Sequence, residues 1–171
     1  MGVSDGGRAL SAPNQVSIRP AREADVELLF SLIVELAEYE RAPEKVVGSP
    51  ELLRIALFGE VPAAEAVIAE RSGVAVGFAL FHGTFSTWEC RPGLWLEDLY
   101  VPERHRRGGV GGALFRHVAG VAVERGCPRL EWAALDWNTP ALDFYVRLGA
   151  EVLDEWKLHR LSSEALRLAS R

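Results

Sequence analysis

Apolar residues recur along the chain with two different periods, and the longer period marks the helices. From Val26 to Ala37 they repeat every three or four positions, which predicts a helix over about 25–40. The same spacing after Val110 predicts a second long helix that Gly126 and Pro128 end. Shorter helices are expected over 51–58 and over about 139–148, each followed by a glycine.

Short apolar runs between turn residues predict the strands. These runs cover residues 16–19, 66–70, 75–81, 94–101, 130–135, 152–153 and 156–161. Ser72-Gly73 predicts a hairpin turn, and residues 84–92 are expected to form a loop. Interleaved helices and strands predict one α/β domain over 16–171, with a mixed twisted sheet of about six to seven strands flanked by about four helices. The polar, Gly- and Ser-containing residues 1–15 are expected to be a disordered tail.

Composition narrows the class of protein. The chain has 171 residues, of which 49% are hydrophobic and 25% charged, so it is expected to fold. A net charge of -5 disfavours general binding to nucleic acid or to an anionic membrane. Cys90 and Cys127 form no CxxC pair, which argues against a structural zinc site, and no metal is expected. With no secretory signal and no apolar run of roughly 18 residues, the prediction is a cytoplasmic protein.

The strongest chemical signal is a basic, glycine-rich turn between a predicted strand and a predicted helix. It reads Arg-His-Arg-Arg-Gly-Gly-Val-Gly-Gly over residues 104–112. Glycines allow close approach of a ligand to the backbone, and a helix start presents unpaired N–H groups, so a pyrophosphate is the expected occupant of 107–112. A flexible surface loop with solvated charges is the alternative interpretation.

Several phosphate ligands are disfavoured by what surrounds this turn. A P-loop needs a Lys-Ser/Thr pair, but the chain has only Lys45 and Lys157. The dinucleotide fingerprint needs a glycine where Leu114 stands. Coenzyme A is the remaining phosphate ligand that suits this arrangement.

The turn and its neighbours resemble a known family. Arg106-x-x-Gly109-x-Gly111, following the strand residues 97–101, resembles the acetyl-CoA motif of the GNAT N-acetyltransferase superfamily. The stretches 35–40, 95–101 and 136–145 are similar to the spermidine/spermine acetyltransferase branch, over roughly residues 16–168. The segment Phe85-Ser86-Thr87-Trp88 resembles the thialysine Nε-acetyltransferase form of that branch.

This resemblance implies the GNAT acyl-CoA N-acyltransferase fold, acetyl-CoA as co-substrate, a homodimer, and direct attack by a small cationic amine in a ternary complex. Backbone groups of the strand before the turn are expected to pair with the pantetheine arm, and Asn138 to hydrogen-bond it. The residues implied in binding acetyl-CoA are Leu99, Tyr100, Val101, Arg106, Arg107, Gly108, Gly109, Val110, Gly111, Gly112, Asn138, Thr139, Pro140 and Tyr145.

Acetyl transfer needs a proton acceptor at the amine and a proton donor at the departing thiolate. Glu97 is the candidate acceptor and Tyr145 the candidate donor, since a phenol is a competent acid towards a thiolate. The resemblance implies that the amine is bound by Tyr39, Glu40, Glu97, Asp98, Ser86 and Trp88. Because Ser86 stands where the polyamine enzymes carry a carboxylate, a shorter amine such as thialysine or a lysine-like amino acid is favoured over a polyamine.

Three alternatives stay open from the sequence. The acceptor can be a protein amino group, the chain can be a non-catalytic acyl-CoA sensor, or Arg104 to Arg107 can serve a small DNA-associated module. A sensor would not need the hydroxyl of Tyr145 as a proton donor.

Overall fold

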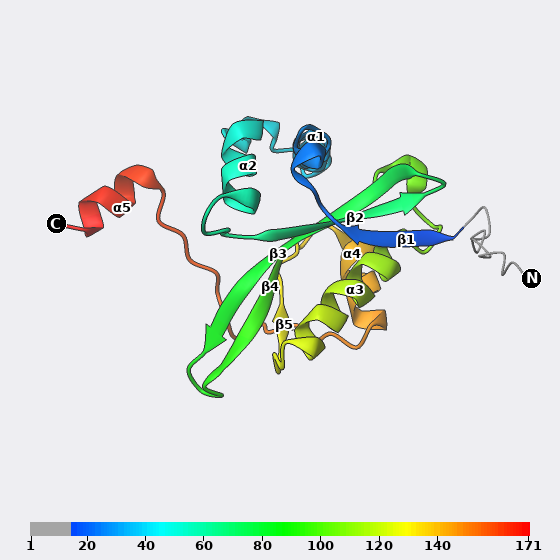
Figure 1. The fold of residues 1–171 in the computed structure, drawn as a ribbon. Coiled ribbons are helices and arrows are strands. Elements are labelled where there is room, and N and C mark those ends of the chain that lie inside the picture. The colour runs from blue at the N-terminus through cyan, green and yellow to red at the C-terminus, as the bar shows by residue number, and fades with distance from the viewer. Residues whose placement is uncertain (1–14) are drawn as a thin grey trace, which may run out of the picture. The chain divides into compact units, whose positions relative to one another are not determined.

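A five-stranded sheet in the order β1-β2-β3-β4-β5 organises the first part of the chain (Figure 1). This is a computed structural model that describes residues 15–171, and the chain divides into two compact units, Met1–Ala133 and Ala134–Arg171. The predicted tail lies outside the described residues except for its last residue. We describe each unit by itself.

Four strands of the first unit pair antiparallel and the fifth pairs parallel. The strands are β1 (Val16–Pro20), β2 (Glu65–Arg71), β3 (Val74–Ser86), β4 (Arg91–Tyr100) and β5 (Leu130–Glu131). β5 joins β4 in parallel at Leu94 and Trp95 only. The predicted loop over 84–92 is therefore too long, because β3 and β4 pair as far as Ser86 and Arg91.

Helices cover both faces of this sheet (Figure 1). α1 (Val26–Tyr39) and α2 (Pro50–Phe58) pack on one face, and α3 (Val110–Glu124) packs on the other. Ser49 starts α2 by accepting a hydrogen bond from the Leu52 N–H at 3.3 Å. Short 3-10 turns occur at Glu23–Asp25, Pro43–Lys45 and Glu103–His105.

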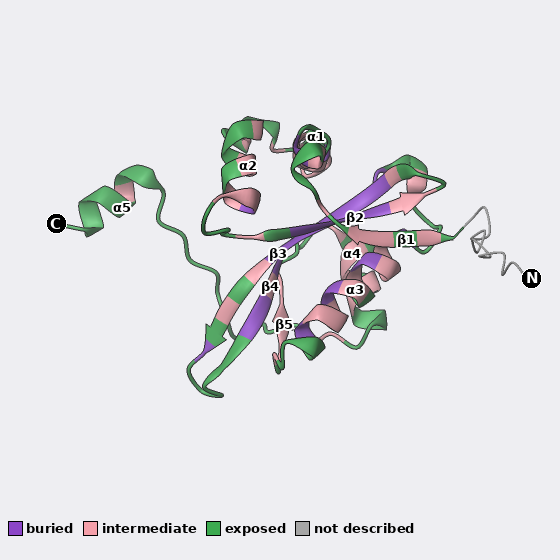
Figure 2. Ribbon diagram, in the orientation of Figure 1, coloured by how far each residue is buried: buried purple, intermediate pink, exposed green. Residues whose placement is uncertain are grey.

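Alternation along the strands supplies the two cores. In β2, Val67 and Ala69 face α3, whereas Ala66 and Ile68 face α1 and α2. Figure 2 shows that the buried residues concentrate in the central strands and on one side of α3. The first unit thus has three layers, with the sheet between α3 on one face and α1 and α2 on the other, and β4 contributes residues to both apolar interfaces.

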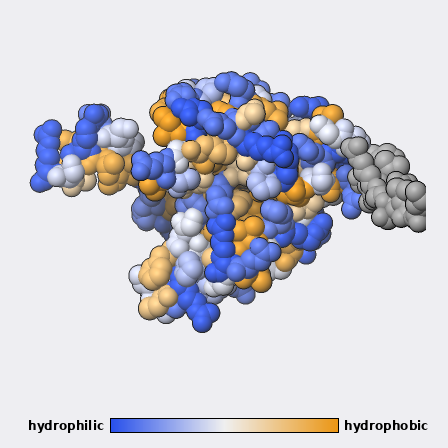
Figure 3. Space-filling view, viewed as in Figure 1, coloured by the Kyte–Doolittle hydropathy of each residue, from blue (hydrophilic) through white to orange (hydrophobic). Residues whose placement is uncertain are grey.

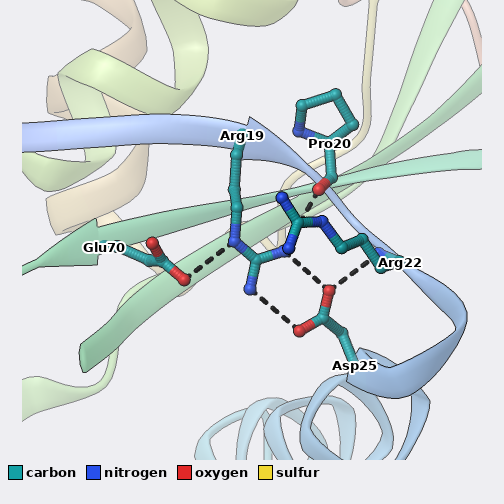
Figure 4. Close-up of polar contacts among 5 residues, drawn as sticks. All are labelled: Arg19, Pro20, Arg22, Asp25 and Glu70. Atoms are coloured by element: carbon teal, nitrogen blue, oxygen red, sulfur yellow. Dashed lines mark hydrogen bonds and ion pairs between the residues drawn. The ribbon is translucent and has the colours of Figure 1, made fainter. Parts of the chain in front are cut away.

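Arg19 links the edge strand β1 to the start of α1 through hydrogen bonds (Figure 4). Arg19 on β1 donates to Glu70 on β2 at 2.8 Å and forms two hydrogen bonds with Asp25, at 2.6 and 2.8 Å. Asp25 also accepts the Arg22 N–H at 2.7 Å. The Arg19 guanidinium lowers the pKa of the Asp25 carboxyl, so this connection is ionic at neutral pH.

The second unit contains α4 (Thr139–Arg147) and α5 (Ser163–Ala169). The strands predicted over 152–153 and 156–161 are wrong, because these residues are irregular and exposed. Within residues 134–171 they have no strand to pair with, and backbone without a ladder partner does not form a strand. α5 was not predicted, and its surface carries hydrophilic and hydrophobic residues side by side (Figure 3).

The numbers of strands and of helices therefore differ from the prediction. The described residues form five strands, not six to seven, because the strands expected over 152–153 and 156–161 do not form, and the strand expected over 130–135 is shortened to Leu130–Glu131. They form five α-helices instead of four. Among residues 15–171, no helix combines the length and the apolar character needed to cross a membrane.

We expect Leu114→Ala to lower the free energy of unfolding by about 3 kcal/mol, because removing a buried leucine leaves a cavity. Leu114 is 0% exposed between α3 and the sheet. The matched control is Val123→Ala on the same helix, at a position that is 77% exposed. Urea unfolding measures both, and equal losses for the two variants would contradict this account of the core.

Candidate active site

The site is built around one extra residue in β4. Leu80 of β3 lies opposite Asp98, whereas the next residue, Phe81, lies opposite Leu96. Glu97 therefore has no partner across the ladder and forms a β-bulge. A bulge bends its strand and redirects the side chains around it, which is why bulges recur next to active sites.

Two side chains hold the carboxylate of Glu97. The Trp95 indole N–H donates to Glu97 Oε2 at 2.8 Å, and His82 Nε2 on β3 lies 3.7 Å from the same oxygen. Sequence reasoning identified Glu97 but missed Trp95 and His82. Neither residue has a role predicted from the sequence. Trp95 lies two residues before Glu97 on β4, and the pairing of β3 with β4 places His82 opposite Trp95.

Further carboxylates lie near the bulge. Burial, together with the nearby charges of Glu97 and Glu40, raises the pKa of Asp98 to about 7. Burial also raises the pKa of Glu40, against the opposing effect of Lys45. The structure thus brings together three of the predicted amine-binding residues, and a bound cation would relieve the repulsion among them.

A second group of predicted residues meets at the end of α1. The Arg106 guanidinium lies 4.4 Å from the centre of the Tyr39 ring and 6.0 Å from that of Tyr100. Arg106 Nε also donates to the Val101 carbonyl at 2.9 Å. Arg106 therefore ties the glycine-rich turn to α1 and to the end of β4.

The glycine-rich turn has the features of an anion site. Gly109 has φ of 77°, in the left-handed region that favours glycine, and it precedes the first residue of α3. Arg71 at the end of β2 donates to the Gly108 carbonyl at 2.8 Å. A Cβ at Gly108 would lie 2.6 Å from Arg71 Nη2, so a larger residue there would displace the Arg71 guanidinium. The helix start and the adjacent guanidinium together fit a pyrophosphate.

Sequence reasoning missed Arg71, which contacts the glycine-rich turn. It lies at the end of β2, far from the turn in the sequence. Two arginines of the basic run over 104–107 make contacts within the chain. Arg104 pairs with Glu35 at 3.2 Å, and Arg106 is engaged as described above. These internal contacts weigh against a surface for duplex DNA formed by 104–107.

β4 offers an open edge next to the turn. β5 pairs with β4 at Leu94 and Trp95, and β4 continues to Tyr100 beyond that pairing. An extended ligand can pair with such an edge through the backbone N–H and C=O groups. This is the stretch, Leu99 to Val101, in which the sequence predicts contacts to the pantetheine arm.

Ser86 and Trp88 lie at the other end of the β3–β4 hairpin. Ser86 is 2% exposed and its Oγ accepts the Glu89 N–H at 3.3 Å, while Trp88 is 87% exposed. At about 3.4 Å per residue, Ser86 lies about 17 Å along β3 from Phe81, which is next to the bulge. Within one chain, the structure does not bring these two residues to Glu97.

The second unit carries the remaining predicted residues. Thr139 and Pro140 begin α4, and the Asn138 carbonyl accepts the N–H groups of Ala141 and Leu142 at 2.9 and 3.0 Å. Burial raises the pKa of Tyr145 on α4 to about 12. The phenol therefore keeps its proton at neutral pH, as a proton donor must.

No cluster of three or more His, Cys, Asp or Glu suited to a metal ion occurs in residues 15–171. The expectation that the reaction needs no metal stays a prediction.

Comparisons with known proteins agree with this geometry. The sequence model described as Acetyltransferase (GNAT) family matches residues 32–150. The thialysine N-epsilon-acetyltransferase of Bos taurus is 40% identical over 163 residues, which cover 89% of this chain and 95% of that protein. The L-ornithine N5-acetyltransferase of Arabidopsis thaliana is 41% identical over 93 residues, 54% of this chain and 41% of its own.

Among solved structures, an integron cassette protein from the mobile metagenome of V. cholerae aligns with a TM-score of 0.76 at 25% identity. The alignment covers 91% of this chain and 98% of that one. Together with the family match, it confirms the α/β fold predicted from the sequence.

We expect Asp98→Asn to flatten the pH dependence of stability. Between the ordinary value of 3.8 and about 7, the folded state keeps the Asp98 proton that the unfolded state releases, so stability falls as pH rises through this window. The loss is at most about 1.4 kcal/mol per pH unit. Urea unfolding from pH 4 to 8 measures it, with the exposed Asp143→Asn as control. An unchanged pH slope in Asp98→Asn would contradict the assignment.

Proposed function

Because the chain belongs to the acetyltransferase (GNAT) family, we propose that it transfers an acetyl group from acetyl-CoA to the side-chain amine of a small, lysine-like amino acid. The protein is an acyltransferase, and its family uses acetyl-CoA as co-substrate. Thialysine is the first candidate acceptor, with lysine and ornithine next. Diamines and polyamines are the second candidates, from the resemblance to the spermidine/spermine branch.

The observation that carries the proposal is the group of three carboxylates at the β4 bulge. Glu97, Asp98 and Glu40 lie close enough for their charges to act on Asp98. Such a group favours a cationic ligand, because burial and the charges of Glu97 and Glu40 both disfavour the ionised form of Asp98, and a bound cation offsets these effects. A primary ammonium has the charge and the three hydrogen-bond donors to satisfy them.

The carboxylates also supply the first proton step. An amine attacks only after it loses a proton, and Glu97, half exposed and held by Trp95, is the proposed acceptor. Acetyl-CoA, when bound, supplies an acetyl group activated as a thioester. The backbone N–H groups at the end of β4 are proposed to bind and orient it, and one of them to polarise the thioester carbonyl.

Tyr145 is the proposed proton donor to the departing thiolate. Burial raises its pKa to about 12, so the phenol is protonated throughout the neutral range. Arg71, Arg107 and the start of α3 are proposed to hold the pyrophosphate. Arg106 is proposed to act less directly, by fixing the turn against Tyr39 and the Val101 carbonyl.

The preference for an amino acid over a polyamine is supported by two facts. Ser86 is a neutral residue, so it offers no charge to a second ammonium. The similar proteins of Bos taurus and Arabidopsis thaliana are named for thialysine and L-ornithine, both amino acids with a terminal amine.

We further propose a homodimer and a cytoplasmic location. The distance of about 17 Å between Ser86 and the bulge supports the homodimer, because a partner's hairpin can reach a site that a chain's own hairpin does not. Cys90 and Cys127 are free thiols, which suits a reducing compartment.

We expect thiol release from acetyl-CoA to be fastest with thialysine or lysine, and slower with spermidine, putrescine and a lysine peptide. Glu97→Gln should lower kcat/KM and recover part of it at high pH, where free amine is abundant. Glu124→Gln, at an exposed position on α3, is the matched control. Fastest release with the peptide would replace the proposal with a protein acetyltransferase. Binding of acetyl-CoA without release by any amine would favour a sensor.

We expect Tyr145→Phe to lower kcat by about 10-fold to 10³-fold with little change in acetyl-CoA affinity, because only the donated proton is lost. Steady-state kinetics give the first quantity and calorimetry the second. An unchanged kcat would remove Tyr145 as the proton donor.

A further inference from the structure

His82 contacts Glu97, and the proposed function gives this contact no role. It lies on β3 opposite Trp95, and the bulge turns the Glu97 carboxylate back towards it. His82 Nε2 and the Trp95 N–H both approach Glu97 Oε2, at 3.7 and 2.8 Å.

The hydrogen bond on the other side of the ring sets the tautomer. His82 Nδ1 lies 3.2 Å from the Gly83 carbonyl oxygen, and a carbonyl oxygen can only accept. Nδ1 therefore carries the proton in the neutral ring, and Nε2 holds a lone pair facing Glu97. The imidazole is arranged to take up a proton at Nε2.

We propose that His82 acts through Glu97 as a proton-accepting partner: it takes over the proton that Glu97 removes from the amine. This inference rests on the proposed function of Glu97. Imidazole is suited to the task because it exchanges a proton near neutral pH.

The proton transfer needs no reactant besides the ammonium, Glu97 and His82. The N–H bond of the ammonium breaks and an O–H bond forms on Glu97, which then returns to a carboxylate as an N–H bond forms on His82 Nε2. The imidazolium faces the restored carboxylate as an ion pair. The His82 side chain is 35% exposed, so it can release the proton to water afterwards.

Other charged groups near His82 and Glu97 come from β4, from the end of α1 and from β5. On β4, Glu97 lies beside Asp98, and the charge of Glu40 at the end of α1 acts on Asp98. On β5, Glu131 lies opposite Trp95 and pairs with Arg129 at 2.8 Å. Among these, Glu97 makes the ion-pair contact with His82.

The test compares kcat/KM of the native protein and of His82→Gln from about pH 5.5 to about pH 8.5. The ionisations of the amine and of Asp98 occur in both proteins and cancel in the ratio of the two. If His82 accepts the proton, we expect the ratio to rise from about 1 at low pH, where the ring is already protonated, to about 10 at high pH. Added imidazole should restore part of the His82→Gln activity.

His117→Gln, a histidine on α3, is the matched control and should give a ratio near 1 at every pH. A ratio for His82→Gln that does not change with pH would overturn the proposal, since a purely structural contact lowers activity equally at all pH values. Circular dichroism confirms that each variant is folded before its kinetics are compared.

A second measurement keeps this inference separate from the proposed function. In an NMR spectrum of the native protein and of Glu97→Gln, the ¹⁵N chemical shift of His82 Nε2 should differ between the two, because the carboxylate that contacts this atom is replaced by an amide. An unchanged shift would overturn the pairing whatever the enzyme acetylates. If no amine is acetylated but the Nε2 shift changes, the proposed function fails while the pairing of Glu97 with His82 is upheld.

Discussion

The pairing of β4 is the constraint on which the site depends. On one side β4 pairs with β3 from Arg91 to Tyr100, and on the other it pairs with β5 at Leu94 and Trp95 only. The extra residue, Glu97, falls just after the point where β5 stops pairing. A single irregularity therefore places a carboxylate and an open row of backbone groups next to each other, as acetyl transfer to an amine requires.

The charges around β4 are divided into two regions. Carboxylates gather at the bulge, where burial and mutual repulsion raise the pKa of Asp98 to about 7. Guanidinium groups gather at the glycine-rich turn, where Arg71 contacts Gly108. Arg106 lies between them, against the Tyr39 ring and the Val101 carbonyl. A cationic amine and an anionic cofactor can thus bind close to each other without sharing their counter-charges.

Much of the fold could be predicted from the sequence, because helical spacing is a local signal. The apolar periods around Val26 and Val110 gave α1 and α3 to within about two residues. The strands over 152–161 were predicted wrongly because an apolar run does not show whether a partner strand exists. The chemistry of Glu97 and of the turn was visible as a motif, whereas Arg71 and His82 were not. Their contacts depend on which residues face each other across strands, and register is not a local property.

We propose that Ser86 affects specificity without lying at the reacting atoms. Its hydroxyl is buried and accepts the Glu89 N–H, so it stabilises the hairpin turn. A carboxylate in the same buried position would lose its hydration and would need a cation as partner. An enzyme with a carboxylate there can recover this cost by binding a second ammonium, as a polyamine provides. On this proposal, serine needs no cationic partner, which removes the energetic reason to prefer a doubly charged amine over a lysine-like one.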